Sequence, residues 1–182
     1  MLDPHHYVEA LNLFGLLDRP EMVPAAVYRC CQLGPGALLE GVQREDGSEA
    51  LERLSPEDLE LCMETVPRLM RATVRVMMGL TDLVEARMSL VCAQQPDCVM
   101  PKTCVGGLAA MLGEWRDHMA YRVDTDALGT DFSEDVDTRV CRGAMCRVCG
   151  DVLRAAHRRF RREVWAALPR LTETDVKGWN SG

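Results

Sequence analysis

Nine cysteines in a chain of 182 residues restrict the fold of this sequence more than any other feature. The first residues contain no basic stretch followed by an apolar one, so the sequence predicts no secretory signal. The expected compartment is therefore reducing, and disulfides rarely persist there. We expect the thiols to be core residues, metal ligands or reactive groups.

Four of the cysteines form two pairs that suit one metal ion. Cys146 and Cys149 form a C-x2-C pair, a spacing that lets two thiolates converge on a tetrahedral ion. A looser C-x5-C pair spans a proline-containing segment. Zn²⁺ favours four soft ligands and has no redox chemistry, and a complete thiolate shell leaves no position for water. The sequence therefore predicts a structural zinc site made of Cys98, Cys104, Cys146 and Cys149.

The competing interpretation is that these thiols are core residues, because free cysteine is a common small core side chain. Two other cysteines, Cys92 and Cys141, lie close enough in the sequence to replace one of the four ligands. The remaining three fall on predicted apolar helix faces, and we assign them to the core: Cys30, Cys31 and Cys62.

The apolar residues indicate an all-α fold. Leu, Val, Ala and Met dominate, isoleucine is absent, and aromatic residues make up 5% of the chain. We predict roughly six helices with irregular loops, in one helical domain over residues 1–171 followed by a C-terminal tail over 172–182. Apolar spacings of three and four residues predict helices at 4–17, 22–32, 37–42, 56–88, 103–119 and 136–168.

Local signals refine these helices. Ser55 followed by Pro56 is typical of a helix start, and Pro67 predicts a kink or break in the same helix. Asp46 and Gly47 indicate the turn of a small hairpin. The segment 124–137 contains six acidic residues and no basic one, which favours an exposed loop. The last predicted helix has an expected interruption near Gly150.

Charge and motifs narrow the classes of function. The net charge is −7, which argues against broad electrostatic binding of nucleic acid or an acidic membrane. No apolar run approaches the roughly 18 residues of a membrane span. No phosphate-binding glycine motif or nucleophile motif occurs. The four histidines have no metal-type or triad-type spacing, so we expect them at the surface or in capping roles. We predict a non-enzymatic, intracellular protein of the cytoplasm or nucleus.

The last predicted helix is basic and allows an alternative function. The basic stretch is formed by Arg154, Arg158, Arg159, Arg161 and Arg162. The simpler interpretation is a solvated face in which some arginines pair with the acidic 124–137 segment. The alternative is a small zinc-stabilised protein that binds nucleic acid through this helix. The acidic chain favours the first interpretation.

Eight short segments in this order resemble a known family. They are PAAVYRCC at 24–31, LLEGV at 38–42, DGS at 46–48, LSPEDL at 54–59, PDC at 96–98, TC at 103–104, CRVC at 146–149 and VWAALP at 164–169. Together they resemble the helical region that follows the BTB/POZ domain in a large group of fungal proteins, mainly from mushroom-forming fungi. The similarity covers about residues 8–171, and the BTB domain itself does not precede it in this sequence.

The resemblance implies an intracellular protein built for protein–protein interaction. BTB-containing proteins act as dimeric scaffolds or as adaptors that present partners to ubiquitin ligases, so ligase components are the partners it suggests. Dimerisation and ligase docking belong to the BTB domain, and they are not expected of these residues. The resemblance also favours the four-cysteine site, because matching pairs recur in the family.

Overall fold

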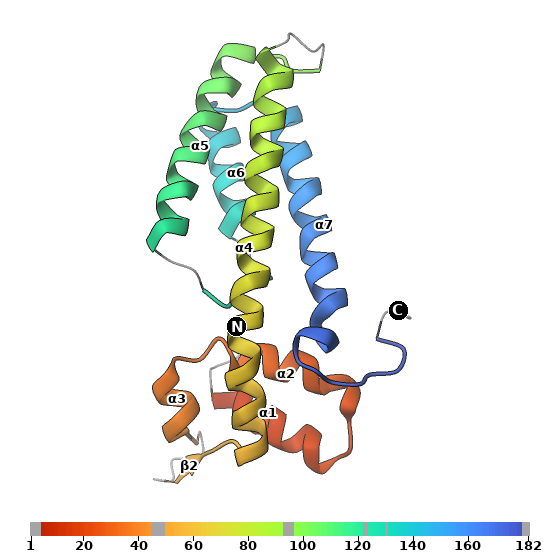
Figure 1. The fold of residues 1–182 in the computed structure, drawn as a ribbon. Coiled ribbons are helices and arrows are strands. Elements are labelled where there is room, and N and C mark those ends of the chain that lie inside the picture. Colours follow the sequence, from red (N-terminus) through yellow and green to blue (C-terminus); the bar gives the residue numbers. More distant parts are fainter. Residues whose placement is uncertain (1–4, 45–49, 93–96, 122–123, 130, 180–182) are drawn as a thin grey trace. The chain divides into compact units, whose positions relative to one another are not determined.

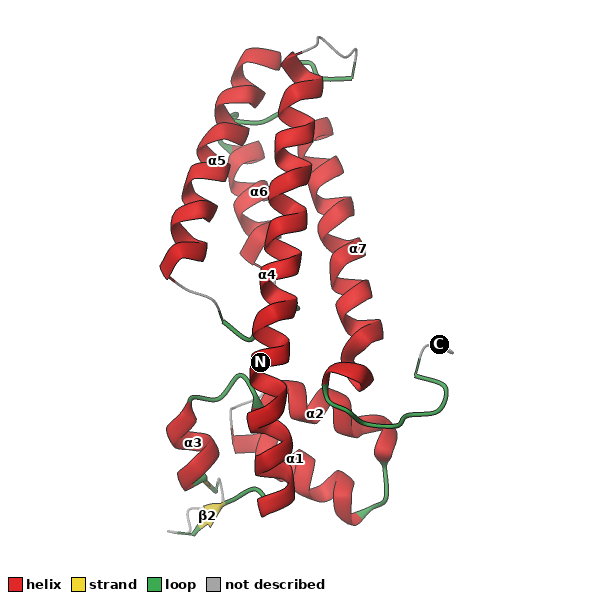
Figure 2. Cartoon of the chain, viewed as in Figure 1, coloured by secondary structure: helices red, strands yellow, loops and turns green. Residues whose placement is uncertain are grey.

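The computed structural model describes residues 5–44, 50–92, 97–121, 124–129 and 131–179. In these ranges the chain forms seven α-helices, one short 3₁₀ helix and two paired strands of two residues each (Figure 1; Figure 2). The predicted all-α class is confirmed. None of the described helices is both long enough and apolar enough to cross a membrane.

The elements follow one another in a simple order. They are α1 (His5–Leu16), η1 (Pro20–Met22), α2 (Val23–Cys30), α3 (Pro35–Glu40), β1 (Val42–Gln43), β2 (Leu51–Glu52), α4 (Pro56–Cys92), α5 (Pro101–Tyr121), α6 (Asp131–Cys141) and α7 (Arg147–Leu171).

The chain divides into two compact units. Unit 1 comprises Met1–Met70 and Trp165–Gly182, and unit 2 comprises Arg71–Val164. Helices α4 and α7 each contribute residues to both units. The predicted boundary between a helical domain and a tail at residue 171 stays a prediction.

Unit 1 combines the first helices with a small hairpin. Its buried apolar side chains include Val8, Leu11, Val27, Leu38 and Leu69. The strands β1 and β2 pair antiparallel around the predicted turn, whose residues 45–49 lie outside the described ranges. Asn12 connects α1 to this hairpin by donating hydrogen bonds to Glu52 Oε1 at 2.7 Å and to the Arg53 carbonyl at 3.0 Å.

The start of α4 agrees with the prediction. The Ser55 hydroxyl accepts a hydrogen bond from the Asp58 amide at 3.0 Å, as a capping residue does. Of the kink or break that we predicted at Pro67, the break is wrong, because α4 is continuous through this residue, and the kink stays a prediction. The proline removes the amide partner of the Met63 carbonyl, and Met63 is half exposed, so water can replace that partner.

The residues after α7 also belong to unit 1. Trp179 stacks on Trp165 with ring centroids 5.0 Å apart, and its indole N–H donates to the Trp165 carbonyl at 2.8 Å. Arg68 on α4 forms a salt bridge with Glu173 at 2.7 Å. The described part of the predicted tail is therefore packed against the helices of its unit.

Unit 2 is a bundle of four helices that lie side by side in Figure 1: α4 from Arg71 onward, α5, α6 and α7 up to Val164. Its core contains Val84, Leu108, Met111, Val136 and Leu153. Salt bridges join α4 to α5, α5 to α6 and α6 to α7, and these pairs are Glu85–Arg116, Glu114–Arg139 and Asp137–Arg154.

Two predictions about the last third of the chain are wrong. The acidic segment 124–137 is not all loop, because α6 begins at Asp131. Carboxylates are favourable near a helix N-terminus. Two of them are also neutralised by arginines from α6 and α7, in the pairs Asp135–Arg139 and Asp137–Arg154.

The second error concerns where the last helical stretch is interrupted. The break falls between Cys141 and Arg147, and Gly150 lies inside α7. A side chain at position 150 would meet Val140 Cγ2 at 2.7 Å. The glycine therefore serves close packing of α7 against α6, and it does not end the helix.

Candidate metal centre

The four predicted ligands come together in unit 2. The sulfur atoms of Cys98, Cys104, Cys146 and Cys149 all lie within 4.8 Å of one another, and all four residues are buried. Cys98 Sγ is 3.9 Å from Cys146 Sγ and 3.8 Å from Cys149 Sγ. A tetrahedral ion with zinc–sulfur bonds of about 2.3 Å separates its sulfurs by about 3.8 Å. The cluster can therefore hold a metal ion without rearrangement of these pairs.

Two junctions between a loop and a helix supply the ligands. Cys98 precedes α5, and Cys104 lies in its first turn, where its amide bonds to the Met100 carbonyl at 2.9 Å. Cys146 immediately precedes α7, and its carbonyl accepts a hydrogen bond from the Gly150 amide at 3.1 Å. Cys149 lies in the first turn of α7. Helix N-termini carry partial positive charge, which stabilises thiolates placed there.

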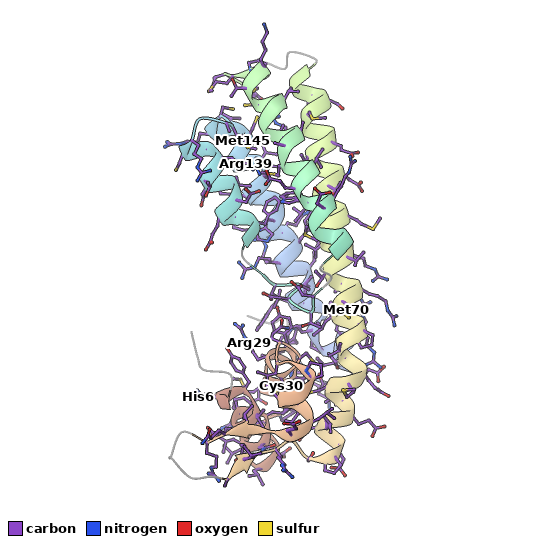
Figure 3. The ribbon with its side chains drawn as sticks, turned by 90° about the vertical axis from the view of Figure 1, so that its left-hand side faces the viewer. His6, Arg29, Cys30, Met70, Arg139 and Met145 are labelled. Carbon is purple, nitrogen blue, oxygen red and sulfur yellow. The ribbon has the colours of Figure 1, made fainter. Side chains whose placement is uncertain are left out.

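A close approach of α5 to the turn before α7 brings the two pairs together. A Cβ atom at Gly107 would lie 2.2 Å from the Ala144 carbonyl oxygen, so only glycine fits at this position. Gly143, in the same turn, has a φ of +72°, a region that favours glycine. Met145, labelled in Figure 3, is buried next to Cys146. The backbone therefore determines where Cys146 meets Cys104.

Hydrogen bonds to sulfur accompany this geometry. The Cys146 amide donates to Cys104 Sγ at 3.1 Å. The Arg87 guanidinium, on α4, donates from Nη2 to Cys149 Sγ at 3.6 Å. Sulfur accepts such bonds well as a thiolate and poorly as a neutral thiol. Both contacts therefore suit ligands in their metal-binding form.

The surroundings of the cluster shift the pKa values of its thiols in different directions. Burial raises the pKa of Cys149 to about 11, although the Arg87 hydrogen bond works in the opposite direction. Burial is also the main reason that the pKa of Cys104 is raised. Burial opposes ionisation of Cys146 too, but hydrogen bonds from the Cys149 amide and thiol and from neighbouring thiols outweigh it and lower the pKa to about 7. A metal ion that binds here would displace protons from the other thiols.

Sequence reasoning missed Arg87. It is 7% exposed and follows Leu80 and Val84 at spacings of four and three residues, so it occupies a position of the buried face of α4. An arginine on the apolar face of a helix was a signal in the sequence that this residue has a buried partner, because arginine is almost never buried without one. The sequence did not indicate that this partner is Cys149, 62 residues away.

The alternative ligands do not join the cluster in the described structure. Cys141 is exposed and lies outside the group. The side chain of Cys92 lies outside the described part of the chain, so its role as a substitute ligand stays a prediction.

The three cysteines assigned to the core are buried in unit 1. Cys30, on α2 and labelled in Figure 3, donates from sulfur to the Tyr7 carbonyl at 3.3 Å. Cys31 donates to the Cys62 carbonyl at 3.5 Å. Hydrogen bonds from these two thiols lower the pKa of Cys62, and the pKa values of Cys30 and Cys31 are raised. Their assignment to the core is confirmed.

His157 is buried, so the predicted surface position of this histidine is wrong. Its Nδ1 lies 3.0 Å from Ser133 Oγ, and its ring packs on Phe132 at a centroid distance of 4.8 Å. Burial, followed by the positive charges of Arg161 and Arg158, lowers the pKa of His157. The residue is therefore a neutral part of the unit 2 core.

Comparisons with protein-family models, curated proteins and solved structures find no match to this chain. The resemblance to the region that follows a BTB domain therefore stays a prediction.

Proposed function

We propose that this chain is a helical protein–protein interaction module in which a structural zinc ion stabilises unit 2. The observation that carries the proposal is the convergence of four buried cysteine sulfurs within 4.8 Å of one another. The zinc ion would join the α5 junction to the α7 junction and would take no part in catalysis.

The donor set favours zinc and a structural role. Four thiolates form a soft shell, which suits Zn²⁺ better than the hard cations Mg²⁺ and Ca²⁺. The sulfur–sulfur distances of 3.8 and 3.9 Å match tetrahedral coordination. Once four sulfurs are bound, no coordination position is left for a water or a substrate.

The interaction role is supported by exposed apolar side chains at the end of α1. Leu16 is 85% exposed, and three more large apolar residues between positions 13 and 22 are also exposed, namely Leu13, Leu17 and Met22. Exposed apolar clusters often mark surfaces that bind protein. The partner we propose is an apolar protein surface, and the family resemblance suggests a BTB-type domain. Ligase components would then join through that domain.

Elemental analysis of the purified protein tests the zinc ion. We expect one equivalent of zinc in the native chain and a loss of zinc with a lower melting temperature in Cys146→Ser. The matched control is Cys141→Ser, because Cys141 is exposed and outside the cluster. Native protein that is folded and free of metal would contradict the proposal.

Photo-crosslinking tests the interaction surface. A crosslinking residue at Leu16 should capture a purified BTB domain, and the same residue at Met78, which is 57% exposed on α4, should not. A Leu16→Glu variant should fold normally and bind the BTB domain at least tenfold more weakly. Equal capture from both positions, or no capture from Leu16, would remove this surface from the proposal.

One observation favours a second candidate function. Arg154 is paired with Asp137 and Asp151, and Arg159 is paired with Glu163. Within the described ranges, no salt bridge engages the other arginines of α7's basic stretch, Arg158, Arg161 and Arg162. These side chains would suit a nucleic-acid backbone. Oligonucleotide binding that persists at physiological salt and is lost in an Arg158→Ala, Arg162→Ala variant would support this function, and binding confined to low salt would exclude it.

A further inference from the structure

Arg87 is a buried cation that forms no salt bridge with an acidic residue in the described part of the chain. It is 7% exposed, and its Nε has no hydrogen-bond partner among the described residues. Within the described part of the chain, its guanidinium donates one hydrogen bond, from Nη2 to Cys149 Sγ at 3.6 Å. A buried charge without compensation is costly, so the position of Arg87 requires a negative group beside it.

The metal-bound cluster supplies such a group. A divalent ion with four thiolate ligands carries two net negative charges, and these charges are buried together with the four cysteines. A neutral thiol at Cys149 would leave the guanidinium uncompensated. Contacts from outside the ligand shell also raise or lower the affinity of a site for its metal.

We propose that Arg87 is the counter-ion of the metal centre, where its guanidinium binds Cys149 Sγ, offsets the negative charge of the ligand shell and so strengthens metal binding. The inference rests on the proposed zinc site and goes beyond it by giving a specific task to a residue of a third helix. Arg87 does not touch the ion, and it acts as a positioning residue through Cys149.

Neighbouring groups support this assignment. Glu85, two residues before Arg87 on α4, pairs with Arg116 on α5 and is therefore already engaged. The Cys146 amide bonds to a different sulfur, that of Cys104, at 3.1 Å. The amide and the guanidinium thus distribute their hydrogen bonds over two ligands, one from each cysteine pair. Among the described residues, Arg87 is the one cationic side chain that donates a hydrogen bond to a cluster sulfur.

The test compares metal binding by the native chain, Arg87→Met and Arg87→Lys. Arg116→Met is the matched control, because it removes an arginine of the same unit that binds a carboxylate and no sulfur. Zn²⁺ affinity is measured by competition with a chromophoric chelator at one fixed pH. Co²⁺ loading gives a second readout through the thiolate-to-cobalt charge-transfer band, which reports the ligand environment directly.

We expect Arg87→Met to bind Zn²⁺ about 10- to 100-fold more weakly. The charge-transfer band should shift as well. Arg87→Lys keeps the positive charge and should recover part of the affinity, which a purely steric role would not produce. Arg116→Met should match the native chain in both readouts.

The outcomes separate this inference from the function on which it depends. Native protein that binds no Zn²⁺ overturns both. Native protein that binds Zn²⁺ no more tightly than Arg87→Met and has the same cobalt band overturns only the role of Arg87. If Arg87→Met does not fold, the decision falls to Arg87→Gln, which also removes the charge. Unchanged Zn²⁺ affinity and an unchanged cobalt band in that variant would likewise overturn the role.

Discussion

The chain contains two groups of buried cysteines, and the groups that contact their sulfurs differ. In unit 1, the sulfurs of Cys30 and Cys31 donate to backbone carbonyls, and both thiols also donate to Cys62. In unit 2, the sulfurs of Cys104 and Cys149 accept from a backbone amide and from a guanidinium. An N–H donor on sulfur favours the thiolate form that binds metal. Among the contacts of the described residues, these two nitrogen donors therefore mark the candidate ligands, although both groups of cysteines are buried.

The backbone explains why only one group has metal-site geometry. Cys30 is the last residue of α2 and Cys31 is its C-cap, and successive side chains on a helix point in different directions. The unit 2 cysteines lie at two junctions between loop and helix, where the chain turns and sulfurs can converge. In the described residues, the unit 2 cluster is the one group with metal-site spacing.

Removal of the metal should have the largest effect and should distinguish the two units. If zinc is present at a thousand times its dissociation constant, a strong chelator should lower the free energy of unfolding by about 4 kcal/mol. Hydrogen exchange measured by mass spectrometry should show lost protection in α5 and α6, with α2 and α3 little changed. An equal loss of protection in both units would contradict the assignment of the metal site to unit 2 alone.

Gly107 tests whether backbone approach creates the site. Gly107→Ala should destabilise unit 2 by about 1–3 kcal/mol and weaken zinc binding, because the new methyl group collides with the Ala144 carbonyl. Gly106→Ala is the control, since a Cβ there meets nothing within 4 Å. That control should stabilise α5 by about 0.5–1 kcal/mol. Thermal denaturation and zinc titration measure both, and equal behaviour of the two variants would contradict the role of Gly107.

Cys62 tests the assignment of the unit 1 thiols to the core. Cys62→Ala should cost about 1 kcal/mol, because it removes a buried atom and leaves a small cavity. The zinc content should not change. Chemical denaturation and elemental analysis provide the two measurements. A fall in zinc content would show that the two cysteine groups are not independent.

Substitution of His157 should change the stability of unit 2 the least. It separates two reasons for a loss of stability in acid, protonation of His157 and release of the metal. Its pKa is lowered by burial in the folded state, so the unfolded chain takes up the proton first as the pH falls. The stability due to neutral His157 is therefore present above about pH 6.5 and is lost below it. In His157→Gln this part of the pH dependence should vanish while metal release by acid remains. Unfolding curves at several pH values, with zinc content measured in parallel, decide the point.

The sequence determined the class of fold and the identity of the ligands. Helical spacing of apolar residues located most helices, because burial of one helix face is a local pattern along the chain. The C-x2-C spacing of Cys146 and Cys149 identified half of the cluster, since two ligands so close in sequence can reach one ion. The start of α4 was also readable from Ser55, whose capping bond spans only three residues.

Other features depended on groups that meet across the bundle. The beginning of α6, residues 131–135, was missed because its acidic residues suggest a loop, and the arginines that pair with this helix lie on its last turn and on α7. The interruption predicted near Gly150 lies instead between Cys141 and Arg147, and the glycine packs against Val140. Local patterns cannot reveal either, because both depend on which helices become neighbours.

The tertiary structure alone decided how the cysteine cluster is assembled and what charge it faces. Gly107 matters only because the turn containing Ala144 approaches α5, and Arg87 matters only because α4 passes beside Cys149. Ligand identity follows from side-chain chemistry, which every residue carries wherever it lies. Close approach and charge compensation arise between segments far apart in the chain, and they exist only once the bundle has folded.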